Sequence, residues 1–327
     1  MPPVSCSSQG AGFIFSGECN DQGLSNHAPI LGRISIGKVV ERNGKRLPEK
    51  DDQFTITTQI QSRDGWVPHP YDADLRQKLS GEKLRSIPVR MLFNDPDLNL
   101  RAEYSLFDRQ NGRPLCAGNG ETCRRYGDSG MKSLPCPSPD ECEFSGGLCK
   151  PYGRLNVKIG DDDDLGSFIF RTTGYNSIRN LTARLHYYQA VSGNLLACLP
   201  LQLRLRGKST TQSHRTPIYY VDITIRDGIS LADAISRARE EHQRQIECGV
   251  DQAALDAAAM NGFANGAFEN TAEEMVDIAE EFLLGQANPS SADQGEMGGL
   301  KESGKPKPSL TDKLQRRIDQ QTPEAPS

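Results

Sequence analysis

The residues of this sequence best suited to chemistry are its cysteines, because five of the nine fall within one 34-residue stretch. In order they are Cys116, Cys123, Cys136, Cys142 and Cys149, separated by six, twelve, five and six residues. The stretch is rich in Gly, Ser, Pro and charged residues and poor in aliphatic ones, so we expect a loop without a hydrophobic core of its own. Such a loop needs something else to hold it together.

Zinc is the interpretation that we favour for this cluster. Clustered thiolates suit Zn²⁺, which takes four soft ligands tetrahedrally and has no redox chemistry of its own. Arg124, Arg125 and Lys132 lie nearby in the sequence and would offset the negative charge of such a site. Unligated surface thiols and a disulfide or redox role remain as alternatives. The cluster has no Cys-x2-Cys pair, which excludes a standard zinc ribbon.

Hydrolytic chemistry has weaker support in the sequence. The five histidines are scattered, and none pairs at a metal-ligand spacing such as HExxH. The four consecutive aspartates at 161–164 could bind a divalent ion, although a solvated hairpin turn is the commoner reason for such a run. Neither a nucleophile elbow nor a catalytic-triad spacing is present. We therefore predict that the protein is not an enzyme.

Most of the chain that would position these residues has the pattern of β-strands. Apolar and polar residues alternate, as in strands with one buried face, at 54–60, 89–93, 155–159, 201–206 and 221–225. One long helix is predicted over 175–191, where apolar residues recur on a single stripe and Gly193 follows as a stop. The predicted fold class is α+β: a mainly antiparallel sheet, one long helix packed on it, a zinc-stapled loop, and an acidic helical and disordered C-terminal tail.

Composition divides the chain into four segments. We expect a mobile N-terminal arm at 1–29, an α+β body at 30–227 that contains the cysteine cluster, a helical extension at 228–285 and a disordered tail at 286–327. Within the extension, residues 271–284 are predicted to form an amphipathic helix with a capping box at Thr271 and Glu274. Acidic residues outnumber basic ones by 18 to 9 in 228–327, whereas the net charge of the whole chain is −5.

Charge and hydropathy also limit where the protein acts. A net charge of −5 does not suggest a general nucleic-acid coat. No run approaches the ~18 apolar residues that a membrane span requires. The first residues lack the basic and apolar regions of a signal peptide, so we expect a cytoplasmic protein without membrane contact.

Several motifs of the body resemble one known family. They are GRISIGKVVERNGKRLPEKDDQFTITT near the start, the series Cys136, Cys142 and Cys149, the segment CKPYGRLNVKIG, and GSFIFRTTGYNSIRNL. Together they resemble the recombination directionality factors of phages and integrative elements, which partner large serine integrases. The resemblance extends from residue 30 to about residue 227. The acidic tail and the thiol of Cys123 depart from the family pattern.

The resemblance implies a non-enzymatic accessory protein that binds a site-specific integrase and biases recombination toward excision. Because the position of Cys123 does not look thiol-bearing in that family, the implied structural zinc ligands are Cys116, Cys136, Cys142 and Cys149, with Cys123 as an alternative ligand. Related chains are sometimes labelled as hydrolases or metal-binding proteins. Two other functions therefore stay open: a zinc-containing nucleic-acid-associated protein of a mobile element and, less favoured, a metal-dependent hydrolase.

An integrase-binding surface of standard size would use aromatic and arginine anchors. The long helix and the 201–226 hairpin offer such groups, and the predicted partner-binding residues are Tyr187, Tyr188, Arg204, Arg206 and Tyr219. Strand alternation lets only one of Tyr219 and Tyr220 point outward. Any DNA contact is expected to be auxiliary to the protein–protein contact.

Overall fold

The computed structural model describes residues 29–42, 45–63, 65–79, 82–127, 130–161, 165–209 and 217–261, together with Ile278 and Phe282. The chain divides into two units, residues 1–287 and 288–327, and every described residue belongs to the first. The predicted N-terminal arm, apart from Pro29, and the predicted disordered tail lie outside the described residues.

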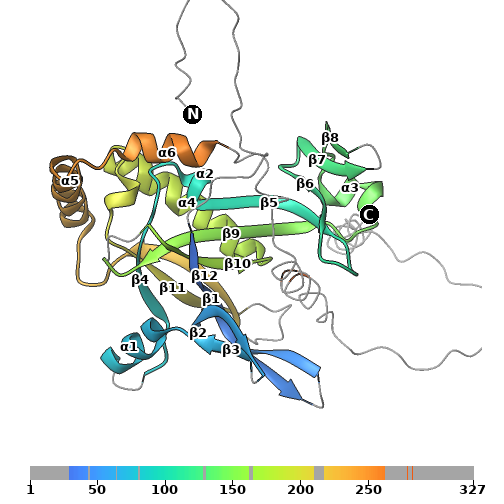
Figure 1. The fold of residues 1–327 in the computed structure, drawn as a ribbon, viewed down its shortest axis with the longest axis horizontal. Helices are drawn as coiled ribbons and strands as arrows, with labels where there is room; N and C mark the ends of the chain where they lie inside the picture. Colours follow the sequence, from blue (N-terminus) through green and yellow to red (C-terminus); the bar gives the residue numbers. More distant parts are fainter. Residues whose placement is uncertain are drawn as a thin grey trace, which may run out of the picture. The chain divides into compact units, whose positions relative to one another are not determined.

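Strands are the commonest regular element of the described structure (Figure 1). The strands are β1 (Ile30–Arg42), β2 (Lys45–Ser62), β3 (Gly65–Pro68), β4 (Ser86–Arg90), β5 (Leu100–Phe107), β6 (Pro114–Gly118), β7 (Thr122–Gly127), β8 (Gly130–Pro135), β9 (Lys150–Ile159), β10 (Ser167–Thr172), β11 (Leu201–Lys208) and β12 (Ile218–Ile225). The α-helices are α1 (Pro70–Lys78), α2 (Pro96–Asn99), α3 (Ser138–Glu141), α4 (Tyr175–Ser192), α5 (Leu231–Glu247) and α6 (Gln252–Met260). Two 3₁₀ turns, η1 (Glu143–Ser145) and η2 (Leu196–Cys198), complete the set.

The strands of the described residues join into one large mixed sheet. Nine of them follow the order β3-β2-β1-β10-β9-β5-β6-β7-β8, while β4, β11 and β12 branch from β9. The first part of β9 pairs with β5 and β10, and its last two residues pair with β4. Every strand pair is antiparallel except β1 with β10, which run parallel. The α+β prediction is confirmed, with one parallel pair that the sequence pattern did not indicate.

The main core lies between the sheet and α4. Leu181 and Leu185 on α4 are fully buried and pack in the same cluster as Leu203 of β11 and Ile223 of β12. The helix is tied to the sheet by a buried hydrogen bond, in which the Val221 amide donates to the Ser177 hydroxyl over 3.0 Å. Gly193 ends the helix in the left-handed conformation, as predicted. The apolar stripe read from the sequence is thus the stripe that α4 buries.

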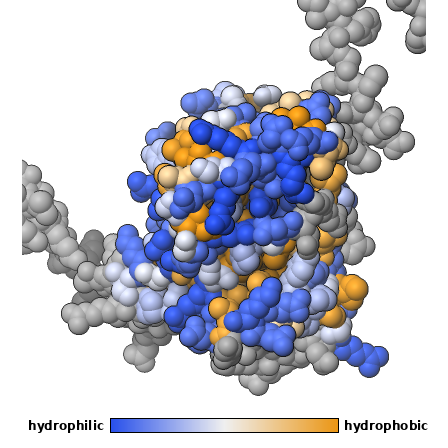
Figure 2. All heavy atoms as spheres, turned by 90° about the vertical axis from the view of Figure 1, so that its left-hand side faces the viewer, coloured by the Kyte–Doolittle hydropathy of each residue, from blue (hydrophilic) through white to orange (hydrophobic). Residues whose placement is uncertain are grey.

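Helix α5 also contributes to the main core, whereas α6 packs next to α2. On α5, Ala234 and Ala238 are buried, and most charged residues of the helix are exposed, such as Asp233, Arg237 and Arg239. Figure 2 shows the face on which α5 lies as largely hydrophilic, with hydrophobic side chains in separate patches. On α6, Leu255 and Ala259 pack against a small cluster around Leu92 and next to α2. None of the described helices is both long enough and apolar enough to cross a membrane.

The cysteine-rich segment is not a loop, which corrects the prediction. Residues 114–135 form the three-stranded meander β6-β7-β8, and α3 and η1 follow before β9. Together, residues 114–149, from β6 to the residue before β9, form a lobe at one end of β5 and β9 (Figure 1), which we call the thiol lobe. The prediction failed because all three strands are short and β7 and β8 are mostly polar, so the segment lacks the alternation of apolar residues that identifies half-buried strands.

One polar side chain, Asn99 at the end of α2 and directly before β5, holds the chain that leads into that strand. It is fully buried, its carbonyl accepts from the amides of Leu92 and Phe93 at 3.0 and 3.1 Å, and its amide donates to two backbone carbonyls. Asn99→Ala would leave both amides buried without an acceptor. Each such loss costs about 1–3 kcal/mol, so we expect the free energy of unfolding to fall by about 3 kcal/mol or more.

Urea denaturation measures this loss, and Asn119→Ala is the matched control. The Asn119 carbonyl also accepts two backbone N–H bonds, from Glu121 and Thr122, but the residue is exposed in a turn. Water replaces the lost bonds there, so we expect a change of less than about 1 kcal/mol. Equal losses from the two substitutions would contradict the role given to Asn99.

Candidate functional site

The five clustered cysteines of the thiol lobe lie on, or next to, different strands and helices. Cys116 lies on β6 and Cys123 on β7; Cys136 follows β8, Cys142 lies between α3 and η1, and Cys149 directly precedes β9. Because the β6-β7-β8 meander and the turn of chain after it fold back onto the end of β5, all five come into one neighbourhood. The four predicted zinc ligands and the alternative Cys123 therefore share one site.

The register of β6 and β7 sets the positions of the first two thiols. Cys116 is paired with Arg125, and Gly118 is paired with Cys123. Since residues two apart on a strand share a face, these four positions lie on the same side of the lobe. A Cβ on Gly118 would sit 2.6 Å from the Cβ of Cys123, so the absence of a side chain at Gly118 makes room for the Cys123 thiol.

The thiols are themselves a large part of the core of the lobe. Cys116 and Cys123 are 8% and 3% exposed, and they form a cluster with Leu106 of β5. Leu115, Leu134, Cys136 and Leu148 pack around this cluster. The lobe thus has a small apolar core, contrary to the expectation of none, but removing the thiols from it would leave only a few leucines.

Burial and mutual proximity dominate the electrostatics of the site. Burial raises the pKa of the Cys149 thiol to about 12, and each of the other four clustered thiols adds to the rise. Burial also raises the pKa of Cys123 to about 11, helped by a hydrogen bond with Cys116. Both thiols are therefore protonated at neutral pH when no metal ion is bound, and a metal ion would have to displace their protons.

The positively charged side chain of Arg125 lies beside the thiols. Burial alone would lower the pKa of Arg125, but its hydrogen bond with Cys116 and its proximity to Cys123 and Cys142 raise it instead. The Arg125 guanidinium also lies 3.8 Å above the centre of the Phe144 ring. Sequence proximity had suggested Arg125 as a counter-charge, whereas the stacking on Phe144 could not be read from the sequence.

The donor chemistry of the cluster fits a soft cation. All five cysteines are free thiols, and thiolates are the ligands that Zn²⁺ prefers in closed tetrahedral sites. As they stand, however, no group of three or more His, Cys, Asp or Glu residues in the described part of the chain is arranged to hold a metal ion. Metal binding would require four of the five neighbouring sulfurs to draw closer together.

The predicted partner-binding tyrosines separate into one exposed residue and two that contact the core. Tyr187 on α4 is 70% exposed, whereas Tyr188 and Tyr219 are partly buried against the main core. Burial raises the pKa of Tyr188, consistent with this packing. Val191, one turn after Tyr187 on the same helix, is 47% exposed. The outer face of α4 therefore presents Tyr187 and Val191 together.

The two predicted arginine anchors are both ion-paired within the chain. Arg204 contacts Asp227, and the Nε of Arg206 donates to the Asp222 carboxylate over 2.7 Å. Asp222 is buried and also lies 3.4 Å from Arg184. Reversing the charge of Arg206 would therefore place a second carboxylate next to a buried one and destabilise the sheet, so Tyr187 offers a cleaner test of a partner surface.

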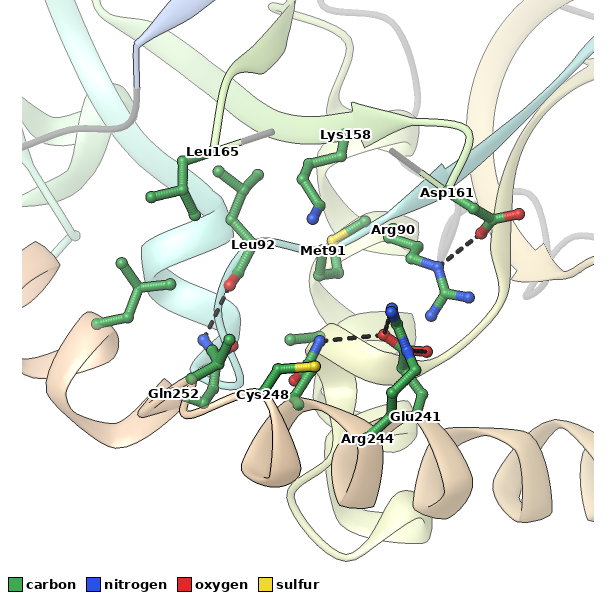
Figure 3. A pocket seen from close by; sticks show the side chains of 14 residues that line it. Arg90, Met91, Leu92, Lys158, Asp161, Leu165, Glu241, Arg244, Cys248 and Gln252 are labelled. Atoms are coloured by element: carbon green, nitrogen blue, oxygen red, sulfur yellow. Dashed lines mark hydrogen bonds and ion pairs between the residues drawn. The ribbon is translucent and has the colours of Figure 1, made fainter. Parts of the chain in front are cut away.

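A pocket of about 250 Å³ between β4, β9 and α5 bears on the hydrolase alternative (Figure 3). At its edge, Asp161 accepts hydrogen bonds from Arg226 at 2.8 Å and from Arg90 at 2.7 Å. These bonds outweigh burial and hold the pKa of the Asp161 carboxyl well below its usual range. Such a carboxylate is a poor proton acceptor at neutral pH, and the residues that line this pocket include no histidine. Asp162, Asp163 and Asp164 lie outside the described residues.

Comparison with known proteins gives one match. A family model described as Gp3-like, recombination directionality factor-like, matches residues 31–226 of the chain. The matched region runs from β1 through β12 and includes the whole thiol lobe and α4. No curated protein and no solved structure matches the chain.

Proposed function

The chain belongs to the Gp3-like family of recombination directionality factor-like proteins, and on that premise we propose that it binds a site-specific serine integrase and biases recombination toward excision. The observation that carries the proposal is the family match over residues 31–226, which covers more than half of the chain. In this role the protein is a non-enzymatic accessory factor. It changes the outcome of a reaction whose bond-breaking steps belong to the integrase.

A factor of this kind must bind one state of the integrase more tightly than the other. A ligand that binds two states of a protein equally well shifts nothing between them, however tightly it binds. Moving an integrase from about 1:99 to about 99:1 in favour of its excising state needs about 10⁴-fold tighter binding to that state. Differential binding of this size calls for a well-packed surface with a few strong anchors.

The exposed face of α4 is the surface that we assign to this contact. Tyr187 and Val191 place an aromatic and an aliphatic side chain one turn apart, and Arg184 lies one turn before Tyr187 with its side chain 46% exposed. Aromatic side chains with a polar end are favoured at the centre of protein interfaces. The underlying helix is rigidly held by its buried stripe and by the Ser177 hydrogen bond, so little order has to be gained on binding.

A structural zinc ion in the thiol lobe is the second part of the proposal. Zinc would join β6, the end of β8, α3 and the start of β9 through four of the five thiols, with Cys116, Cys136, Cys142 and Cys149 as the assigned ligands. Four protein ligands leave no open coordination position, so the ion would stabilise the lobe and take no part in catalysis. Arg125, which already hydrogen-bonds Cys116, would balance part of the negative charge.

A recombination assay in vitro tests the first part of the proposal. Purified integrase would be incubated with substrates for integration and for excision, with and without this protein. We expect the protein to stimulate excision and to suppress integration. A mobility-shift arm without integrase addresses the nucleic-acid alternative: DNA retained by this protein alone, with recombination unchanged in both directions, would replace our proposal with that alternative.

A further inference from the structure

Two residues of the C-terminal extension are buried against the end of the sheet. Ile278 and Phe282, both helical, are 0% and 1% exposed, and they form a cluster with Phe107 of β5 and Tyr152 of β9. The residues between them and residue 261 lie outside the described part of the chain. The predicted amphipathic helix at 271–284 thus includes both of these buried residues.

Phe282 packs against two aromatic rings of the sheet and one lysine. Its ring centre lies 4.8 Å from that of Phe107 and 6.2 Å from that of Tyr152, both at steep angles that suit edge-to-face contact. The Phe107 and Tyr152 rings are themselves 5.2 Å apart. The Nζ of Lys150 lies 5.5 Å from the centre of the Phe282 ring, so a cation closes one side. We call Phe107, Tyr152 and Lys150 the aromatic groove.

The aromatic groove is separate from the main core. Tyr152 and Lys150 occupy alternate positions of β9, on the face opposite to Leu155 and Val157, which belong to the main core. None of the four clustered residues takes part in the main core. Removing Ile278 and Phe282 from the groove would therefore expose Phe107 and Tyr152 without opening a cavity beneath α4.

Ile278 and Phe282, which we call the two anchors, have the spacing that is common in helices that bind in a groove. Residues four apart lie on one side of a helix, and a helix bound in a groove commonly inserts such a pair. The anchors lie within a strongly acidic sequence, because Glu273, Glu274, Asp277, Glu280 and Glu281 surround them and residues 271–285 contain no basic residue. The acidic sequence complements the Lys150 cation.

We propose that the aromatic groove is a docking site for an acidic amphipathic helix of a partner protein, and that Ile278 and Phe282 occupy the groove in cis until such a helix replaces them. The partner helix carries an aliphatic residue, an aromatic residue four positions later, and acidic neighbours for Lys150. This surface lies on β5 and β9 and is distinct from the α4 face assigned above, so the inference does not depend on the integrase proposal.

A peptide competition measures the exchange. The probe is a fluorescein-labelled peptide of residues 271–285, and the protein is the full chain, either wild type or I278A/F282A. A competitor within the same chain has an effective concentration on the order of 1 mM, so a peptide that binds the open groove at about 10 µM should bind the wild type about 100-fold more weakly. Anisotropy titrations give both dissociation constants.

Two controls define the site. A peptide with alanine at both anchor positions should bind neither protein, and F107A added to I278A/F282A should weaken binding of the native peptide at least 10-fold. Equal affinity of the peptide for the wild type and for I278A/F282A would overturn the proposal. So would full binding to the variant that also carries F107A.

Hydrogen exchange of the wild-type protein tests the proposal independently, in case I278A/F282A does not fold. We expect the amides of Ile278 and Phe282 to exchange through a local opening that leaves the amides of β9 protected. Exchange of these amides only together with β9 would show that the segment is a fixed part of the core, and would overturn the proposal.

Discussion

Cys136→Ser should reduce the zinc content of the purified protein from about one ion per chain to background, because a structural tetrahedral site needs all four of its ligands. The closest control is Cys248→Ser, which removes an exposed thiol outside the thiol lobe and should leave the zinc content unchanged. Cys123→Ser then separates the two ligand sets. Zinc should remain if Cys116, Cys136, Cys142 and Cys149 are the ligands, and should be lost if Cys123 is one of them.

The same substitution should unfold the thiol lobe before the rest of the protein. Binding of structural zinc is worth about 10–16 kcal/mol in small zinc-finger peptides, whereas the leucines around Cys116 and Cys123 form only a small core. The main core under α4 contains no residue of the cluster and should keep its stability. Hydrogen exchange should therefore show β6 to β8 losing protection in Cys136→Ser while β11 and β12 keep theirs.

Two results would contradict the zinc proposal. One is protein purified without chelator that contains no zinc while the thiol lobe is fully protected from exchange. The other is Cys136→Ser with the zinc content of the wild type. In either case the thiols would act as ordinary small hydrophobic residues of the lobe.

Tyr187→Ala should weaken binding to the cognate integrase by about 30-fold, the cost of losing a hot-spot side chain worth about 2 kcal/mol. Stimulation of excision should fall in parallel, because the factor acts only through its differential binding. The side chain is 70% exposed, so the fold should not change. Binding is measured by titration against labelled integrase, and folding by the thermal transition.

Tyr175→Ala provides the matched control for this prediction. Tyr175 is also a tyrosine of α4 and is 60% exposed, but it lies at the first position of the helix, about 18 Å along the axis from Tyr187. We expect it to change integrase affinity by less than about 3-fold. Equal losses from both substitutions, or no loss from Tyr187→Ala, would remove the outer face of α4 from the proposed interface.

The parts of the fold that could be predicted are those whose burial repeats with a simple period. Leu201, Leu203 and Leu205 alternate in the sequence and are all buried on β11, and Leu181 and Leu185 are spaced as a helix requires and are fully buried on α4. The parallel pairing of β1 with β10 could not be predicted, because nothing in either strand's own pattern records which distant strand lies beside it.

The candidate site shows the same division. The density of cysteines identified the thiol cluster, but the pairing of Cys116 with Arg125 depends on the register of two short strands that the sequence did not reveal. Similarly, Tyr187 and Tyr188 are neighbours in the sequence, and only the orientation of α4 decides that the first is exposed and the second packs against the core. Sequence identifies the groups that can act, and tertiary structure decides which of them are accessible.

The parallel pairing of β1 with β10 also constrains the order of events during synthesis. Gly32 of β1 is paired with Phe168, so at 5–20 residues per second this edge of β1 waits on the order of ten seconds for its partner to emerge. Every thiol of the lobe precedes β10, so the lobe can fold on the ribosome while the large sheet is still open. Until β10 is synthesised, β1 and β9 each expose an unpaired edge. Because unpaired strand edges promote aggregation, we expect nascent chains that are halted before Ser167 to be the most prone to aggregate.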